Sequence, residues 1–249
     1  MKNKKWYGAV IVIILIAVTI TGVVIYQSMQ DKSEEVKIQR TSAEFIHVGD
    51  SRVEKIDINA GCKDLDNFKL LKPKDYKSTM QLDPAYWVEP AMENPQGEGY
   101  RYAGSFCIPL LQGMEHTVST IEYEINGQRK TADIGRHKIS FQKGKDLYEK
   151  SLDKKENQDV VLMLDTEGYG KLVKAEVVNK DLKTTVRIER KQAEAFVYLL
   201  SPNFQGYDEV LTNMKYTFEK DGKLTVYYGT ATLSFGTDGL NYTYHHVSE

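Results

Sequence analysis

Cysteine is scarce in this chain, which has two among 249 residues, Cys62 and Cys107. Neither belongs to a Cys-x-x-Cys pair or stands in a cluster with histidine, so the pattern does not favour zinc or redox chemistry. Both are predicted to lie outside the cytoplasm, where an even pair permits a disulfide that would contribute about 4 kcal/mol. Two buried thiols that never meet are the alternative.

Catalytic signatures are missing as well. The sequence has no Gly-x-Ser-x-Gly elbow, no His-Glu-x-x-His zinc helix and no phosphate-binding Gly-Lys-Ser/Thr loop. His245 and His246 are adjacent, and adjacent strand residues point to opposite faces, so the pair does not suit one metal ion. The acidic stretches at 64–66 and 153–159 lack the glycine and the distant glutamate of an EF-hand. We therefore expect no enzymatic activity, no metal and no cofactor.

A basic excess is also absent. Of the 33 basic residues, three lysines precede the first apolar segment, which leaves 30 basic against 35 acidic residues. The resulting charge of about −5 is ordinary for a soluble surface and lacks the positive excess that nucleic-acid binding requires. Nucleic acid is therefore not expected as a partner.

The segment from Trp6 to Tyr26 contains no charged residue. As a helix it would span about 30 Å, the thickness of the hydrocarbon core of a bilayer. The preceding lysines predict that residues 1–5 stay in the cytoplasm and that the rest of the chain lies outside. A cleaved signal peptide is the alternative, but the apolar run is longer than such segments and ends without a small-x-small site. We predict a single-pass protein of the cell membrane, with the lipid bilayer as its first partner.

Beyond the transmembrane helix predicted over 6–26, the pattern is mostly β. Residues 27–47 are polar with alternating charges and are predicted to form a stalk. Two regions with short alternating strands follow, at 48–142 and 159–249, and a charged linker over 143–158 separates them. Turn signals about every ten residues are typical of β-sandwiches. We therefore predict two small extracellular β-sandwich domains of the Ig-like kind.

Local signals refine this prediction unevenly. Asn126-Gly127 and Asp221-Gly222 each stand between alternating apolar residues, which predicts β-hairpins. Residues 193–214 are ambiguous, because their apolar residues fit helical spacing and also include a run that suits a buried strand. A helix pair there would make the second domain α+β, and this alternative stays open.

The most suggestive surface candidate is aromatic. Tyr86, Trp87, Tyr100 and Tyr102 flank a stretch of proline and glycine. Rings held on an exposed rigid loop can stack on sugars or anchor a protein partner. The alternative is that Trp87 fills the core of the first domain and the tyrosines cover it.

These observations predict a membrane-anchored, non-catalytic protein that works by binding or assembly in a bacterial cell envelope. Its partner would be another envelope protein. A second hypothesis is a module that binds carbohydrate or peptidoglycan through Trp87 and the nearby tyrosines. A third is an envelope enzyme with an unrecognised site, which predicts a cleft with converging carboxylates or histidines of shifted pKa.

Overall fold

The computed structural model describes residues 36–49, 52–61, 68–78, 87–90, 101–110, 112–154, 159–236 and 239–244. About 75% of this part is strand and none of it is helix, which confirms the prediction of a mostly β chain. Residues 193–214 lie largely in strands, so the α+β alternative for this segment is wrong. Among the described residues, no helix is long and apolar enough to cross a membrane. The transmembrane segment predicted over 6–26 lies outside them.

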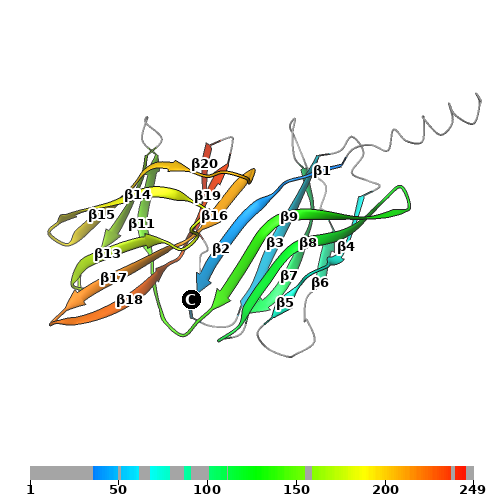
Figure 1. The fold of residues 1–249 in the computed structure, drawn as a ribbon. Coiled ribbons are helices and arrows are strands. Elements are labelled where there is room, and N and C mark those ends of the chain that lie inside the picture. Colours follow the sequence, from blue (N-terminus) through cyan, green and yellow to red (C-terminus); the bar gives the residue numbers. More distant parts are fainter. Residues whose placement is uncertain are drawn as a thin grey trace, which may run out of the picture. The chain divides into compact units, whose positions relative to one another are not determined.

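The described strands form four sheets (Figure 1). The largest has the order β20 (Gly239–Tyr244), β19 (Ala231–Gly236), β16 (Glu209–Thr212), β2 (Thr41–His47), β9 (Gln128–Phe141), β8 (Glu115–Ile125) and β4 (Phe68–Pro73), with β5 (Lys77–Ser78) also paired to β8. A second sheet has the order β1 (Lys37–Ile38), β3 (Arg52–Gly61), β7 (Arg101–Leu110) and β6 (Trp87–Pro90). The third is β10 (Lys145–Leu147), β18 (Lys223–Gly229), β17 (Met214–Lys220) and β13 (Lys171–Val177). The fourth is β11 (Glu149–Lys154), β12 (Val160–Asp165), β15 (Glu194–Asn203) and β14 (Lys183–Lys191).

The eight-stranded sheet takes strands from both regions that the sequence separates. β2 lies between β9 and β16 and runs parallel to both, with Ala43 opposite His137 on one side and Leu211 on the other. Residues 41–47, the end of the predicted stalk, therefore form a central strand, and the folded part begins before residue 48. The predicted linker over 143–158 contains the strands β10 and β11. The other predicted boundaries stay predictions.

The predicted hairpins form where turn residues accept positive φ. Asn126 and Gly127 have φ of 50° and 75° and join β8 to β9. Asp221 and Gly222 have φ of 52° and 74° and join β17 to β18. Two positive φ values in succession are the signature of the type I′ turn, whose twist matches that of paired strands. Both hairpin predictions are confirmed.

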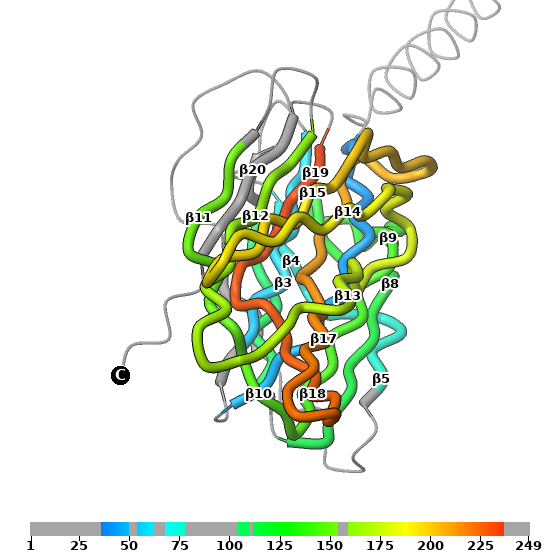
Figure 2. The backbone as a smooth tube through the Cα atoms, turned by 90° about the vertical axis from the view of Figure 1, so that its left-hand side faces the viewer, coloured from blue at the N-terminus to red at the C-terminus, as the bar shows by residue number. Residues whose placement is uncertain are grey.

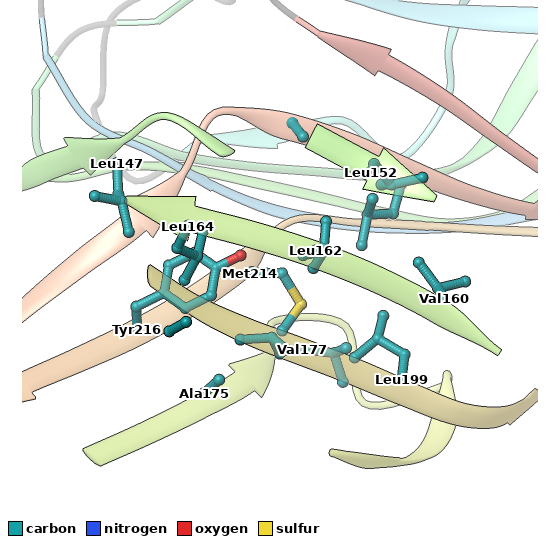
Figure 3. Packing of buried hydrophobic residues seen from close by; sticks show 14 of the residues in the cluster. Leu147, Leu152, Val160, Leu162, Leu164, Ala175, Val177, Leu199, Met214 and Tyr216 are labelled. Atoms are coloured by element: carbon teal, nitrogen blue, oxygen red, sulfur yellow. The ribbon is translucent and has the colours of Figure 1, made fainter. Parts of the chain in front are cut away.

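The third and fourth sheets enclose an apolar core. Leu162 and Leu164 of β12 are buried together with Tyr216 of β17 and Leu199 of β15 (Figure 3). Phe218 of β17 belongs to the same core. β12, β15 and β14 lie side by side in that order (Figure 2). Inward residues alternate with outward ones along β15 and β17, as expected of strands with one buried face. This packing is a β-sandwich, and its Ig-like character stays a prediction.

Candidate functional site

A groove opens between the end strands of the two sandwich sheets. β13 ends one sheet and β14 ends the other, and no strand in the described part of the chain pairs with the outer edge of either. The groove is shallow and largely open to solvent, with a volume of about 640 Å³. Its lining consists of Ala175, Glu176, Val177, Lys180, Leu182, Lys183, Thr184, Thr185, Val186, Leu200, Ser201 and Asn203.

The inner wall of this groove is apolar. Val177 and Leu182 are buried members of the sandwich core, and Val186 packs against that core. Strand alternation turns Ala175 and Val177 inward and leaves Glu176 between them partly exposed. The groove therefore brings the margin of the apolar core close to solvent.

The strand pairing is irregular on both sides of the groove. β13 has one extra residue between Leu172 and Lys174 relative to β17, and β15 has one extra residue opposite the stretch from Lys183 to Thr185 of β14. In that part of β15, Ser201 has a φ of 47°, in the left-handed region that few residues other than glycine adopt. Such bulges bend a strand and are frequent at sheet edges and beside functional sites.

The backbone of β13 directs hydrogen-bonding groups into the groove. The Val178 N–H donates to the Asn213 carbonyl at 3.0 Å, on the side of β17. Because bonding direction alternates along an antiparallel strand, the N–H and C=O groups of Ala175 and Val177 point away from β17. The edge of β13 that faces the groove is therefore polar, although the side chains below it are not.

Alternate residues of β14 likewise direct their backbone N–H and C=O groups away from β15. Gln192, with φ of 46°, and Ala193 form a two-residue turn that makes Lys191 and Glu194 the closing pair of the hairpin. Counting back from this pair by alternation, the backbone groups of Val186 point away from β15. Two strand edges thus border one groove.

Side chains cover both ends of the β13 edge. Arg190 Nε donates to the Leu172 carbonyl at 2.7 Å and so reaches from β14 to β13. Lys180 Nζ donates to the Val177 carbonyl at 2.8 Å. Charged side chains placed this way limit unselective pairing at a sheet edge. Between these two contacts, the backbone of Ala175 faces the groove.

Lysines outnumber acids along the groove. Lys174 Nζ lies 2.9 Å from Glu176 Oε1. This hydrogen bond lowers the pKa of Glu176, partial burial opposes the effect, and the charges of Lys174, Lys180 and Lys215 add to the lowering. Lys183 lines the groove as well. With Asp181 in the adjoining hollow, the region holds two carboxylates against four lysines, which leaves it positive.

A smaller hollow of about 280 Å³ shares Lys183 and Asn203 with the groove. At one side of it, Asp181 Oδ2 accepts hydrogen bonds from Ser42 Oγ at 2.6 Å and Arg136 Nη2 at 3.0 Å. These two donors belong to β2 and β9. The hollow therefore ends against the eight-stranded sheet.

A buried asparagine organises this junction. Asn179 is fully buried, and its Nδ2 donates to the carbonyls of Ser42 at 2.8 Å and Leu211 at 3.0 Å. Its Oδ1 accepts from Arg136 Nη2 at 3.3 Å, and Arg136 also contacts Glu44 Oε2 at 3.2 Å. The turn that forms one end of the groove is thus bonded to the central strand of the large sheet.

None of the four aromatic residues predicted to form a binding surface lines the groove as described. Tyr86 and Tyr100 lie outside the described residues, whereas Trp87 belongs to β6 and Tyr102 to β7. The structure describes the backbone of these two strand residues but not their side chains. The proposed aromatic surface therefore stays a prediction.

The predicted disulfide is equally open. Cys107 is buried on β7, with no exposed surface. Cys62 lies outside the described residues. The bridge between them therefore stays a prediction.

His47, His116 and His137 are isolated in the sequence and lie in the described part of the chain. Among the residues that the structure describes, no group of three histidine, cysteine, aspartate or glutamate side chains could hold a metal ion. Each histidine has its own neighbour: His47 lies 3.4 Å from Glu54, His116 contacts the Tyr76 hydroxyl, and His137 lies 3.3 Å from the Ile134 carbonyl. These contacts join strands and loops rather than converge on a cleft.

Two aromatic rings on the outer face of β15 have cations over them. The Arg187 guanidinium lies 4.3 Å from the centroid of the Tyr198 ring, and Lys191 Nζ lies 4.9 Å from that of Phe196. Such cation–π contacts use the ring face that a sugar would stack on. This pair therefore does not favour glycan binding at the sheet face.

The groove residues carried only weak signals in the sequence. Residues 172–178 and 186–188 were recognisable as strands from their alternation, but alternation does not reveal which strands end a sheet. Nothing in the sequence distinguishes Lys174, Lys180 and Lys183 from ordinary solvated lysines. The excess of lysine between two predicted strands was the one signal that could have pointed to an edge.

No family model matches this chain, and no curated protein matches it either. Among solved structures, a chimeric titin Z1Z2 is 8% identical over 79% of this chain and 95% of its own, with a TM-score of 0.23. The tandem Ig repeats of Dlar are 10% identical over 79% and 96%, with a TM-score of 0.24. The Bacteroides ovatus protein SGBP-B, in complex with a mixed-linkage heptasaccharide, is 11% identical over 80% and 48%, with a TM-score of 0.21. Scores this low assign neither a family nor a function.

Proposed function

We propose that this chain is a non-catalytic binding protein of a bacterial cell envelope, and that the groove between β13 and β14 receives its protein partner. One observation carries the proposal. The groove places an apolar wall, two outward-directed strand edges and a positive surround in one space of about 640 Å³. That combination suits the binding of another polypeptide, which supplies both apolar side chains and backbone hydrogen bonds.

The cellular location in this proposal depends on the sequence. The uncharged segment 6–26 and the lysines before it support a membrane anchor with a cytoplasmic amino terminus and an external β-rich part. Protease added to intact cells is expected to digest the β-rich part. Digestion only after the cells are lysed would contradict this location without affecting the groove.

Site-specific cross-linking tests the groove. Thr185 is exposed and lines it, so a small diazirine amino acid at this position is expected to capture a partner protein in intact cells. The matched control is Thr131, an exposed strand residue of β9 that does not line the groove. A diazirine there should capture nothing at the same mass.

Reversing the charge of two lysines tests whether the capture from position 185 depends on the groove. Replacing Lys174 and Lys180 by glutamate is expected to reduce capture from position 185 about tenfold, because these charges surround the groove. Equal capture from positions 185 and 131, or capture that survives the reversal, would contradict the groove as the binding site.

A further inference from the structure

We infer that the groove binds an extended, acidic segment of the partner, which pairs as an added strand with the edge of β13. This inference rests on the proposed function, since it specifies what the same groove recognises. It commits to one kind of occupant, a polypeptide in β conformation.

The backbone geometry supports an added strand. The N–H and C=O of Ala175 and the N–H of Val177 point away from β17 into the groove, as the Val178–Asn213 bond requires. Pairing with another strand satisfies such groups at the spacing at which they occur.

The end contacts set the length of the pairing. Arg190 bonds the Leu172 carbonyl at one end, and Lys180 bonds the Val177 carbonyl at the other. The stretch between them, from Lys174 to Val177, is about 13 Å long at the rise of a strand. About four residues of the occupant pair along this length.

The side-chain pattern follows from the wall of the groove. Alternate residues of an added strand point to one side, toward the core margin formed by Val177, Leu182 and Val186. These positions require apolar side chains of modest size. The intervening residues of the occupant point outward, beside Lys174 and Glu176.

The positive charge of the groove favours acidic side chains at the outward positions of the bound segment. Lys174, Lys180 and Lys215 act on the carboxylate of Glu176, and Lys183 lines the same space. Acidic residues at the outward positions of the occupant would be attracted to this surround, whereas basic residues would be repelled. The expected sequence therefore alternates apolar and acidic residues.

Selection from a random heptapeptide library displayed on phage tests this specificity. The full-length chain, purified in detergent, is the bait. Peptides with alternating apolar and acidic residues are expected to be enriched, and proline is expected to be absent from their centre, because it cannot complete a strand ladder. Failure to enrich such peptides would overturn the inference.

Hydrogen exchange distinguishes strand addition from simple occupation of the groove. The selected peptide is expected to slow exchange of the amides of Ala175 and Val177, because both would donate to it. Binding without this protection would overturn strand addition. The variant Ala175→Pro removes one outward N–H, and proline is tolerated where a strand N–H faces away from its sheet. It is expected to abolish peptide binding.

A charge-reversal variant at the surface tests the inference even if Ala175→Pro fails to fold. The double variant K174E/K180E is expected to weaken binding of the acidic peptide about tenfold and to bind a lysine-substituted version better. The double variant K143E/K223E is the control, because it changes two exposed lysines outside the groove by the same charge. Equal weakening in both double variants would overturn the charge selection.

The outcomes separate the inference from the proposed function. Capture of a partner from position 185, without any enriched acidic peptide, leaves the binding role in place and removes strand addition. Peptide binding with amide protection, without capture in cells, leaves the strand-accepting groove in place and removes the cellular role. If neither partner capture in cells nor peptide binding is observed, both the proposed function and the strand-addition inference are wrong.

Discussion

Two buried ionisable side chains show how burial alters single residues. Burial lowers the pKa of His137 from 6.5 to about 4, against the opposing effect of the Ile134 carbonyl. Burial raises the pKa of Glu149, although hydrogen bonds from the Ala231 N–H and the Tyr216 hydroxyl oppose it. The two groups therefore affect stability in opposite directions as the pH changes.

His137 is expected to destabilise the fold below neutral pH. Between pH 6.5 and about 4 the unfolded chain binds a proton at this residue and the folded chain does not, so the free energy of unfolding falls as the pH falls. The slope from this group is about 1.4 kcal/mol per pH unit. Urea unfolding of wild type and His137→Leu at pH 4.5 to 7.5 measures it. An unchanged slope in the variant would contradict the assignment.

Glu149 adds the opposite trend at higher pH. Its folded-state pKa lies above the ordinary value of 4.5, so the stability it contributes is complete below 4.5 and is lost as the pH rises through the raised pKa.

The carboxylate of Glu149 lies where a Cβ on Gly229 would be, which explains the glycine at the end of β18.

At the scale of elements, the parallel pairing of β2 and β9 depends on one glycine. Gly135 lies opposite Thr41 in the register, with a φ of 93°. A Cβ at this position would overlap the Thr41 carbonyl. The glycine therefore permits both a backbone conformation and a close approach that other residues prevent.

Gly135→Ala is expected to lower the free energy of unfolding by about 3 kcal/mol, because it combines positive-φ strain with steric overlap. Thermal or urea unfolding followed by circular dichroism measures the change. Gly113→Ala is the matched control, since Gly113 has a φ of 85° with open space around it. A cost of about 1 kcal/mol is expected there. Similar losses in both variants would show that the contact with Thr41 contributes nothing.

At the scale of the whole molecule, the sandwich and the eight-stranded sheet are joined by buried polar contacts. Asn179 bonds Ser42 of β2 and Leu211 of β16, and Asp181 accepts from Ser42 and Arg136. Each of these groups would be costly to bury without its partner. These polar contacts add to an apolar core that the sandwich shares with β16 and β19 through Val210, Leu233 and Phe235.

Asn179→Leu is expected to cost about 3 kcal/mol, because it removes from a buried position the amide that donates to the Ser42 and Leu211 carbonyls. Hydrogen exchange should speed up in β2 and β16 more than in β12, whose backbone pairs with β11 and β15 instead. The control Asn203→Leu, at an exposed position, should cost less than about 0.5 kcal/mol. A uniform increase in exchange across all strands would contradict a local role at the junction.

Much of the local structure was predictable from sequence. Asn126-Gly127 and Asp221-Gly222, each between alternating apolar residues, predicted two hairpins, because these signals act between neighbours in the chain. The segment 193–214 was ambiguous because apolar residues occupy both faces of β15. Val197 and Leu199 are buried, but Phe196, Tyr198 and Leu200 on the partly exposed face are apolar too, so the sequence itself shows no alternation.

The tertiary structure alone decided which strands are central and which are edges. Residues 41–47 resembled a polar stalk, yet pairing with β9 and β16, far away in sequence, makes them the centre of a sheet. The groove arises for the same reason, since β13 and β14 border it only because no described strand pairs with their outer sides. The alternation of side chains along a strand indicates which face of the strand is buried. The neighbouring strand at each edge is set by hydrogen bonds between backbones that are distant in sequence, and these bonds depend little on the identity of the side chains.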